Sequence, residues 1–160
     1  MRKVLIFFVL YLFANGAFAM EYIHTEQYVD HKWDEKKIFG SVNVSQAIQA
    51  FQNYPYADQL RKAPTIQQPT FPTISFECSE DASVLAIWSL SPGNYEIYHR
   101  SPTGKQYTIE VSDTDYIVEV IEIYFSNDRE KLKVELENHK GVVIAGGFFK
   151  KMMSLFKKNA

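Results

Sequence analysis

Residues 83–112 read "SVLAIWSLSPGNYEIYHRSPTGKQYTIEVS", and apolar residues alternate with polar ones through much of this stretch. A period of two is typical of strands with one buried and one exposed face. Two turn sequences, "PGN" at 92–94 and "SPTGK" at 101–105, interrupt the pattern, and connections this short join antiparallel strands. With "TISFECS" at 73–79, the stretch predicts an antiparallel β-meander of four strands between Thr73 and Ser112.

The residues before this meander predict two short helices. Asn43 is a suitable N-cap, because its side chain can accept a hydrogen bond from an early backbone N–H. Pro55 is tolerated at the first position of a helix but not in its interior. The first helix should therefore end near Asn53, and the second should run from Pro55 to about Lys62. The apolar face of the first helix consists of Val44, Ala47, Ile48 and Phe51.

The residues after the meander predict further helices. In "DTDYIVEVIEIYF" (113–125) the apolar residues recur at helical spacing. A strand is the alternative, but Glu119 would then break its apolar face. "REKLKVELENHKG" (129–141) continues the helical pattern. The predicted fold class is thus α+β, a small antiparallel β-meander packed with N-terminal and C-terminal helices.

The two ends of the chain differ from this body. Residues 1–19 have Arg2 and Lys3, then an apolar run, then "AFA", which is the layout of a cleaved secretory signal peptide. We therefore expect a periplasmic or secreted protein with one domain over residues 20–160. Residues 20–40 show no sustained period and are predicted to form an irregular arm.

The charge is unevenly distributed along the chain. Residues 148–160 carry four lysines and no acid, whereas residues 20–147 carry 11 basic and 19 acidic residues, a net charge of −8. An acidic body argues against nucleic-acid binding and suits a basic protein partner. The basic, amphipathic segment Phe148–Ala160 has two interpretations: a helix packed on the sheet, or contact with an anionic membrane surface.

No catalytic, metal-binding or cofactor-binding motif is present. The chain lacks G-x-S-x-G, H-E-x-x-H, C-x-x-C and a phosphate-binding loop. Its single cysteine, Cys78, lies in an alternating apolar segment that predicts a buried side chain. We therefore expect no enzyme activity, no cofactor and no metal. A small hydrolase that uses Cys78 with His99 is kept as an alternative.

Roughly from Gln46 to Leu136, the chain combines a short helix, an aromatic-proline-aromatic corner, a proline-threonine entry into a strand, and a helical end. The residues that carry this pattern are Phe51, Tyr54, Pro55, Tyr56, Gln59, Ala63, Pro72, Thr73, Ile74 and Phe76, with "YIVEVIEIYFSNDREKL" as the helical end. In this pattern the chain resembles small bacterial proteins of the immunity type, which neutralise toxins. The resemblance implies neutralisation by binding, without catalysis.

These observations predict an exported, non-catalytic inhibitor of a protein toxin. A peripheral envelope protein held by its basic tail is the second alternative beside the hydrolase. In the helical interpretation Asp115, Glu119 and Glu122 share one exposed face, which could occupy the basic cleft of a toxin. Tyr54 and Tyr56, beside Pro55, are the second candidate surface, although aromatic residues at such a corner usually fill the core.

Overall fold

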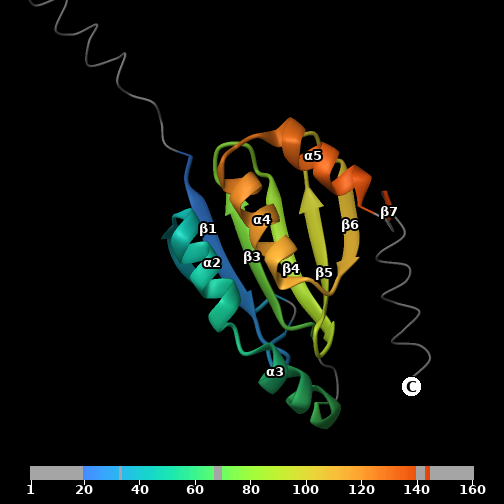
Figure 1. Cartoon of the computed structure of the whole chain (residues 1–160). Helices are drawn as coiled ribbons and strands as arrows, with labels where there is room; N and C mark the ends of the chain where they lie inside the picture. The colour runs from blue at the N-terminus through green and yellow to red at the C-terminus, as the bar shows by residue number, and fades with distance from the viewer. Residues whose placement is uncertain (1–19, 33, 67–69, 140–142, 145–160) are drawn as a thin grey trace, which may run out of the picture.

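The computed structural model describes residues 20–32, 34–66, 70–139 and 143–144. Within these residues a seven-stranded antiparallel sheet has the order β2-β1-β3-β4-β5-β6-β7 (Figure 1). The strands are β1 (Tyr22–Gln27), β2 (Lys37–Val42), β3 (Thr73–Cys78), β4 (Val84–Ser91), β5 (Asn94–Arg100), β6 (Gln106–Val111) and β7 (Val143–Ile144).

The helices form a layer on one face of this sheet. Figure 1 shows α2 (Val44–Asn53) in front of β1, with α4 (Thr114–Phe125) and α5 (Arg129–Asn138) beside it in the same layer. The short helix α3 (Tyr56–Lys62) lies at the lower end of the sheet and continues into a 3₁₀ turn, η1 (Ala63–Thr65). The fold is therefore α+β, as the sequence predicted.

The core lies between the sheet and the helix layer. Paired strand residues point to the same face, so the register places alternate side chains of β3 to β6 toward the helices. Tyr124 in α4 donates hydrogen bonds from its hydroxyl to the carbonyls of Phe76 and Ser83, at 3.2 and 2.9 Å. The buried set from strands and α4 includes Ile74, Phe76, Cys78, Leu85, Ile87, Ile97, Ile109, Ile117, Val120, Ile121 and Tyr124.

Both predicted helices around Pro55 are present, and the second begins at Tyr56, one residue later than predicted. The Asn43 side chain accepts a hydrogen bond from the Gln46 backbone N–H at 3.0 Å, and the Gln46 side chain accepts from the Asn43 N–H at 2.9 Å. This capping box begins α2, which ends at Asn53. Pro55 is the residue directly before α3, so its missing N–H falls where a helix needs none. The segment 114–125 is helical, which excludes the strand alternative.

The prediction of an irregular arm over residues 20–40 is wrong. Residues 22–27 of this segment form β1 and residues 37–40 form the start of β2, and β1 is paired on both sides, with β2 and β3. The alternation was hidden because His24 and Glu26 occupy core-facing positions of β1. The buried Glu26 carboxylate accepts a hydrogen bond from the Tyr28 hydroxyl, and burial lowers the pKa of His24, which favours its neutral form. Burial and this carboxylate raise the pKa of Tyr28 to about 12.

The predicted signal peptide (1–19) and basic tail (148–160) lie outside the described residues. Four of the strands are those of the predicted meander, and β1, β2 and β7 extend the sheet on both sides of it. In the part of the chain that the structure describes, no helix has the length and apolar character needed to cross a membrane.

Candidate partner-binding site

The corner around Pro55 is fixed to the sheet by two buried tyrosine hydroxyls. Tyr54 donates to the backbone carbonyl of Gln27, at the end of β1. Tyr56 donates to the carbonyl of Ile87, in β4, at 3.1 Å. Burial raises the pKa of both tyrosines, so both hydroxyls keep the proton that they donate. The exposed fractions of Tyr54 and Tyr56 are 5% and 7%, so both residues fill the core at the bend, as such aromatic residues usually do.

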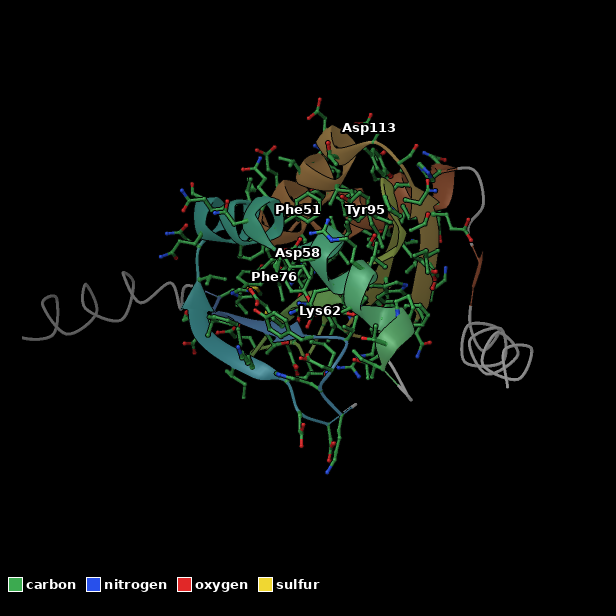
Figure 2. The ribbon with its side chains drawn as sticks, turned by 90° about the horizontal axis from the view of Figure 1, so that it is seen from below. Phe51, Asp58, Lys62, Phe76, Tyr95 and Asp113 are labelled. Atoms are coloured by element: carbon green, nitrogen blue, oxygen red, sulfur yellow. The ribbon has the colours of Figure 1, made fainter. Side chains whose placement is uncertain are left out.

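Their rings also belong to an aromatic cluster that reaches the surface. Phe51 in α2 and Tyr95 in β5 meet edge to face, with ring centroids 5.9 Å apart. Tyr56 lies between them and Tyr54, with centroids 5.3 Å from Tyr95 and 4.4 Å from Tyr54. Tyr95 is half-buried and lies with Phe51 on the helix side of the sheet (Figure 2). The cluster is a rigid apolar floor, since both tyrosines of the corner are anchored at their far ends.

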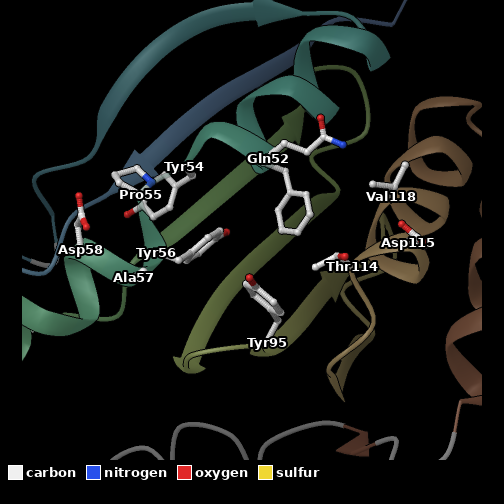
Figure 3. Close-up of a pocket in the computed structure, with 11 residues that line it drawn as sticks. Gln52, Tyr54, Pro55, Tyr56, Ala57, Asp58, Tyr95, Thr114, Asp115 and Val118 are labelled. Atoms are coloured by element: carbon white, nitrogen blue, oxygen red, sulfur yellow. The ribbon is translucent and has the colours of Figure 1, made fainter.

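A pocket of about 430 Å³ opens above this floor, and we call it the corner pocket. Figure 3 shows Tyr56 and Tyr95 on one side of it and Thr114, Asp115 and Val118 of α4 on the other. Its lining residues are Phe51, Gln52, Tyr54, Pro55, Tyr56, Ala57, Asp58, Tyr95, Thr114, Asp115 and Val118. The pocket thus forms where the end of α2 and the start of α3 face the first turn of α4.

Two acids, Asp58 and Asp115, line the corner pocket, and a third, Asp113, directly precedes α4. Asp58 pairs with Arg61 one turn further along α3. Asp113 caps α4, because its side chain accepts from the Asp115 N–H at 2.9 Å. Asp115 itself is exposed, and within the described residues its carboxylate has no ion-pair partner. Asp115 therefore supplies the available negative charge at the mouth.

From Asp115 a line of carboxylates, which we call the acidic row, continues along α4. Its members, Asp115, Glu119 and Glu122, are exposed and spaced one helical turn apart. No ion pair to any of the three forms among the described residues. The neighbouring helix α2 carries no charged side chain, and α4 carries no Lys or Arg. These two packed helices therefore carry no positive charge, and the negative charge lies on α4.

The structure brings two of the predicted surfaces together at one place. Asp115 from the acidic row and the two tyrosines of the corner line the same pocket, whereas Glu119 and Glu122 lie beyond it along α4. The sequence did not identify Phe51, Tyr95 or Thr114 as site residues. Tyr95 had a signal, since it alternates with Ile97 and His99, but the alternation alone does not say which face of the sheet meets the helices.

The pair proposed for a hydrolase is not assembled. Cys78 in β3 donates to Glu80 at 3.2 Å, and His99, two strands away, bonds to the Val84 carbonyl through Nδ1 at 3.0 Å. Burial raises the pKa of the Cys78 thiol and lowers the pKa of His99 to about 4. Both shifts favour the neutral forms, which disfavours a thiolate–imidazolium pair.

Potential metal ligands are also dispersed, since no group of three or more His, Cys, Asp or Glu side chains suited to a metal ion occurs in residues 20–32, 34–66, 70–139 and 143–144. Compared with protein-family models, with curated proteins and with solved structures, the chain gives no match in any of the three.

Proposed function

We propose that this chain is an exported, non-catalytic binding protein that neutralises a basic protein toxin by covering its cationic surface. The observation that carries the proposal is the acidic row of α4 running directly into the corner pocket with its aromatic floor. The immunity-type resemblance of the corner is consistent with it. Residues 1–19 act as the signal that exports the chain.

The corner pocket suits a lysine or arginine side chain of the partner. The rings of Tyr56 and Tyr95 can lie along the aliphatic stem, and the Asp115 carboxylate at the mouth can meet the cationic head. A cation over an aromatic ring contributes about 0.5–2 kcal/mol, more when water is excluded. Because the floor is anchored through Tyr56 to β4, little ordering is needed when the side chain enters.

The rest of the acidic row acts at longer range. Glu119 and Glu122 are exposed and unpaired within the described residues, so their field reaches the solvent in front of α4. Such charges mainly raise the association rate for a partner of opposite sign, and salt reduces the effect. A toxin that acts on nucleic acid, anionic lipid or cell wall needs a basic cleft, which this row would occupy in place of the substrate.

The test begins with differential capture. The mature chain and its Glu119→Lys/Glu122→Lys variant are immobilised, and secreted and periplasmic proteins of the source strain are passed over both. We expect a basic protein that the unchanged chain retains and the variant does not. Expression of that protein in the periplasm should arrest growth, and co-expression of the unchanged chain should restore it.

Asp58→Ala is the matched control, because Asp58 lines the same pocket but is already paired with Arg61. This variant should retain the partner. Equal capture by all three chains, or a captured protein whose toxicity the chain does not relieve, would contradict the proposal.

A further inference from the structure

Strand β2 is the edge of the sheet, and one of its two sides is open. Among the described residues it pairs only with β1, along Lys37–Val42. Helix α2 lies in front of β1 (Figure 1), and every side chain of β2 is exposed or half-buried. The backbone N–H and C=O groups on the open side of β2 can therefore pair with a further strand.

β2 also presents two large apolar side chains to solvent, one on each face of the sheet. Ile38 and Phe39 are 73% and 54% exposed, the highest values for large apolar residues in the described part of the chain. Phe39 stacks on the core-facing His24, with ring centroids 4.7 Å apart, so it lies on the helix side. Ile38 is paired with Thr25, which points to the opposite face because it alternates with His24. A helix would cover one of these faces, whereas an added strand covers both.

A bulge in β2 restricts how such a strand can pair. Ile38 and Gly40 are paired with successive residues of β1, so Phe39 is the extra residue between them. Bulges and lysines at an edge prevent strands from stacking in any register, and Lys37 begins β2. The open edge is six residues, about 20 Å, long, which corresponds to a small interface. The added strand must therefore fit β2 in one particular register.

β2 fits a second copy of itself in such a register. Gly40 has a φ of +88°, and no atom lies within 4 Å of the position that a Cβ would take. A two-fold axis between Phe39 and Gly40 places Phe39 of each copy opposite Gly40 of the other. Each ring then has room over the glycine, an arrangement that stabilises edge strands. The same pairing places Ile38 opposite Ser41, so each copy covers the apolar side chains of the other.

The charges near β2 favour the same register. Lys36 directly precedes β2 and Glu21 directly precedes β1, which begins opposite Val42. The two-fold pairing therefore brings Lys36 of one copy level with Glu21 of the other. Both side chains are exposed, and neither makes an ion pair within the described residues. Two strand spacings, about 10 Å, then separate the two residues, a distance at which opposite charges still attract at moderate salt.

We propose that the chain forms a two-fold dimer through β2, in which the sheets of two copies join into one antiparallel sheet. Each β2 is used once, so association through this edge stops at two copies. The inference goes beyond the proposed function, because no residue of β2 lines the corner pocket and each copy keeps its own.

Sedimentation equilibrium of the mature chain over a wide range of concentrations tests the dimer. We expect a mass that rises from that of one chain to that of two and no further. Phe39→Lys should raise the dissociation constant at least about thirtyfold, because it places a charge at the centre of the interface. Val134→Lys is the matched control, since Val134 is 51% exposed but lies on α5, and it should leave the dissociation constant unchanged. The mass of one chain at every concentration, or equal effects of the two substitutions, would overturn the proposal.

Cysteine cross-linking tests the register without the Phe39 variant. Chains with Ile38→Cys and chains with Ser41→Cys should form a disulfide-linked dimer when they are mixed and oxidised with copper phenanthroline, because the two positions face each other. The native Cys78 is buried and does not compete. Either chain alone should stay unlinked, since its two cysteines are then about 10 Å apart along the strands. Equal linking in the mixture and in the separate chains, or no linking in the mixture, would contradict the pairing.

Hydrogen exchange of the β2 amides distinguishes a second copy from other occupants of the edge. In the mature chain the amides on the open side of β2 should be protected at concentrations that give the dimer and lose this protection on dilution. Protection that does not depend on concentration would place another segment of the same chain along β2. That result would overturn the dimer.

Discussion

The hydroxyl of Tyr56 in α3 donates a hydrogen bond of 3.1 Å to the backbone carbonyl of Ile87 in β4. Tyr54 makes the corresponding bond to Gln27 at the end of β1. The corner around Pro55 is thereby attached to two strands of the sheet. This attachment fixes one wall of the corner pocket relative to α4, which forms the other wall.

The first prediction concerns this anchor. Tyr56→Phe removes the donor and keeps the ring, so it should lower the free energy of unfolding by about 1–2 kcal/mol. Urea unfolding followed by circular dichroism measures the change. Tyr95→Phe is the control, because the Tyr95 hydroxyl makes no hydrogen bond among the described residues and its loss should cost less than about 0.5 kcal/mol. An equal decrease in the free energy of unfolding of the two variants would show that the hydrogen bond of Tyr56 does not stabilise the fold.

The second prediction concerns the ion pair that holds the turn before β4 to the start of α5. Arg129 Nε donates to Asp81 at 3.1 Å and its terminal nitrogen to the Tyr124 carbonyl at 2.9 Å. Both side chains of the pair are 19% exposed. Arg129→Met should therefore cost about 2–4 kcal/mol, because Asp81 is left without its cation.

Arg61→Met provides the comparison for this pair. Arg61 binds Asp58 on an exposed helix surface, so its loss should cost less than about 1 kcal/mol. A double-mutant cycle with Asp81→Asn measures the coupling of Arg129 to Asp81 directly. A coupling energy near zero would refute the claim that the ion pair between Arg129 and Asp81 stabilises the fold.

The third prediction concerns acid stability through His99. Burial lowers the pKa of His99 in the fold from 6.5 to about 4. Because the unfolded chain then takes up the proton more readily, the contribution of His99 is fully present above pH 6.5 and is lost as the pH falls toward 4. The loss is on the order of 3 kcal/mol.

His99→Phe isolates this contribution, since carboxylates titrate in both proteins and cancel in the difference. The free energy of unfolding of the unchanged chain should fall more steeply between pH 6.5 and 4 than that of the variant. Parallel curves would mean that His99 takes up its proton without cost in the folded state.

The fourth prediction concerns export. N-terminal sequencing of the protein recovered from the periplasm or medium should begin at Met20, because "AFA" at 17–19 provides the small residues that a signal peptidase requires. Ala19→Arg should block processing and accumulate the precursor. Recovery of the intact, unprocessed chain as the stable form would contradict the assignment of residues 1–19 as a signal peptide.

Local patterns in the sequence were sufficient to predict the helices and strands in which the buried side chains are mostly apolar. The meander, the capped helix at Asn43 and the helix of 114–125 all place apolar residues on the buried face, so period alone identified them. β1 could not be recognised in this way. Two of its core-facing residues are the polar His24 and Glu26, which break the apolar alternation of the strand.

The candidate site was predicted as two separate surfaces. The exposed acids of α4 followed from helical spacing, and the aromatic corner followed from Pro55. Their meeting in one pocket depends on the packing of α2 against α4 and on Tyr95 from a distant strand. These are long-range contacts, and the sequence carries no local signal for them.

The role of the acidic row is tested most directly by association kinetics with the captured partner. The rate constant is measured at several salt concentrations for the unchanged chain and for Glu119→Lys/Glu122→Lys, with circular dichroism to show that the variant is folded. If the row steers the partner, association of the variant should slow at least about tenfold at low salt and lose its dependence on salt. Unchanged association rates and an unchanged salt dependence in the folded variant would place the binding surface elsewhere on the molecule.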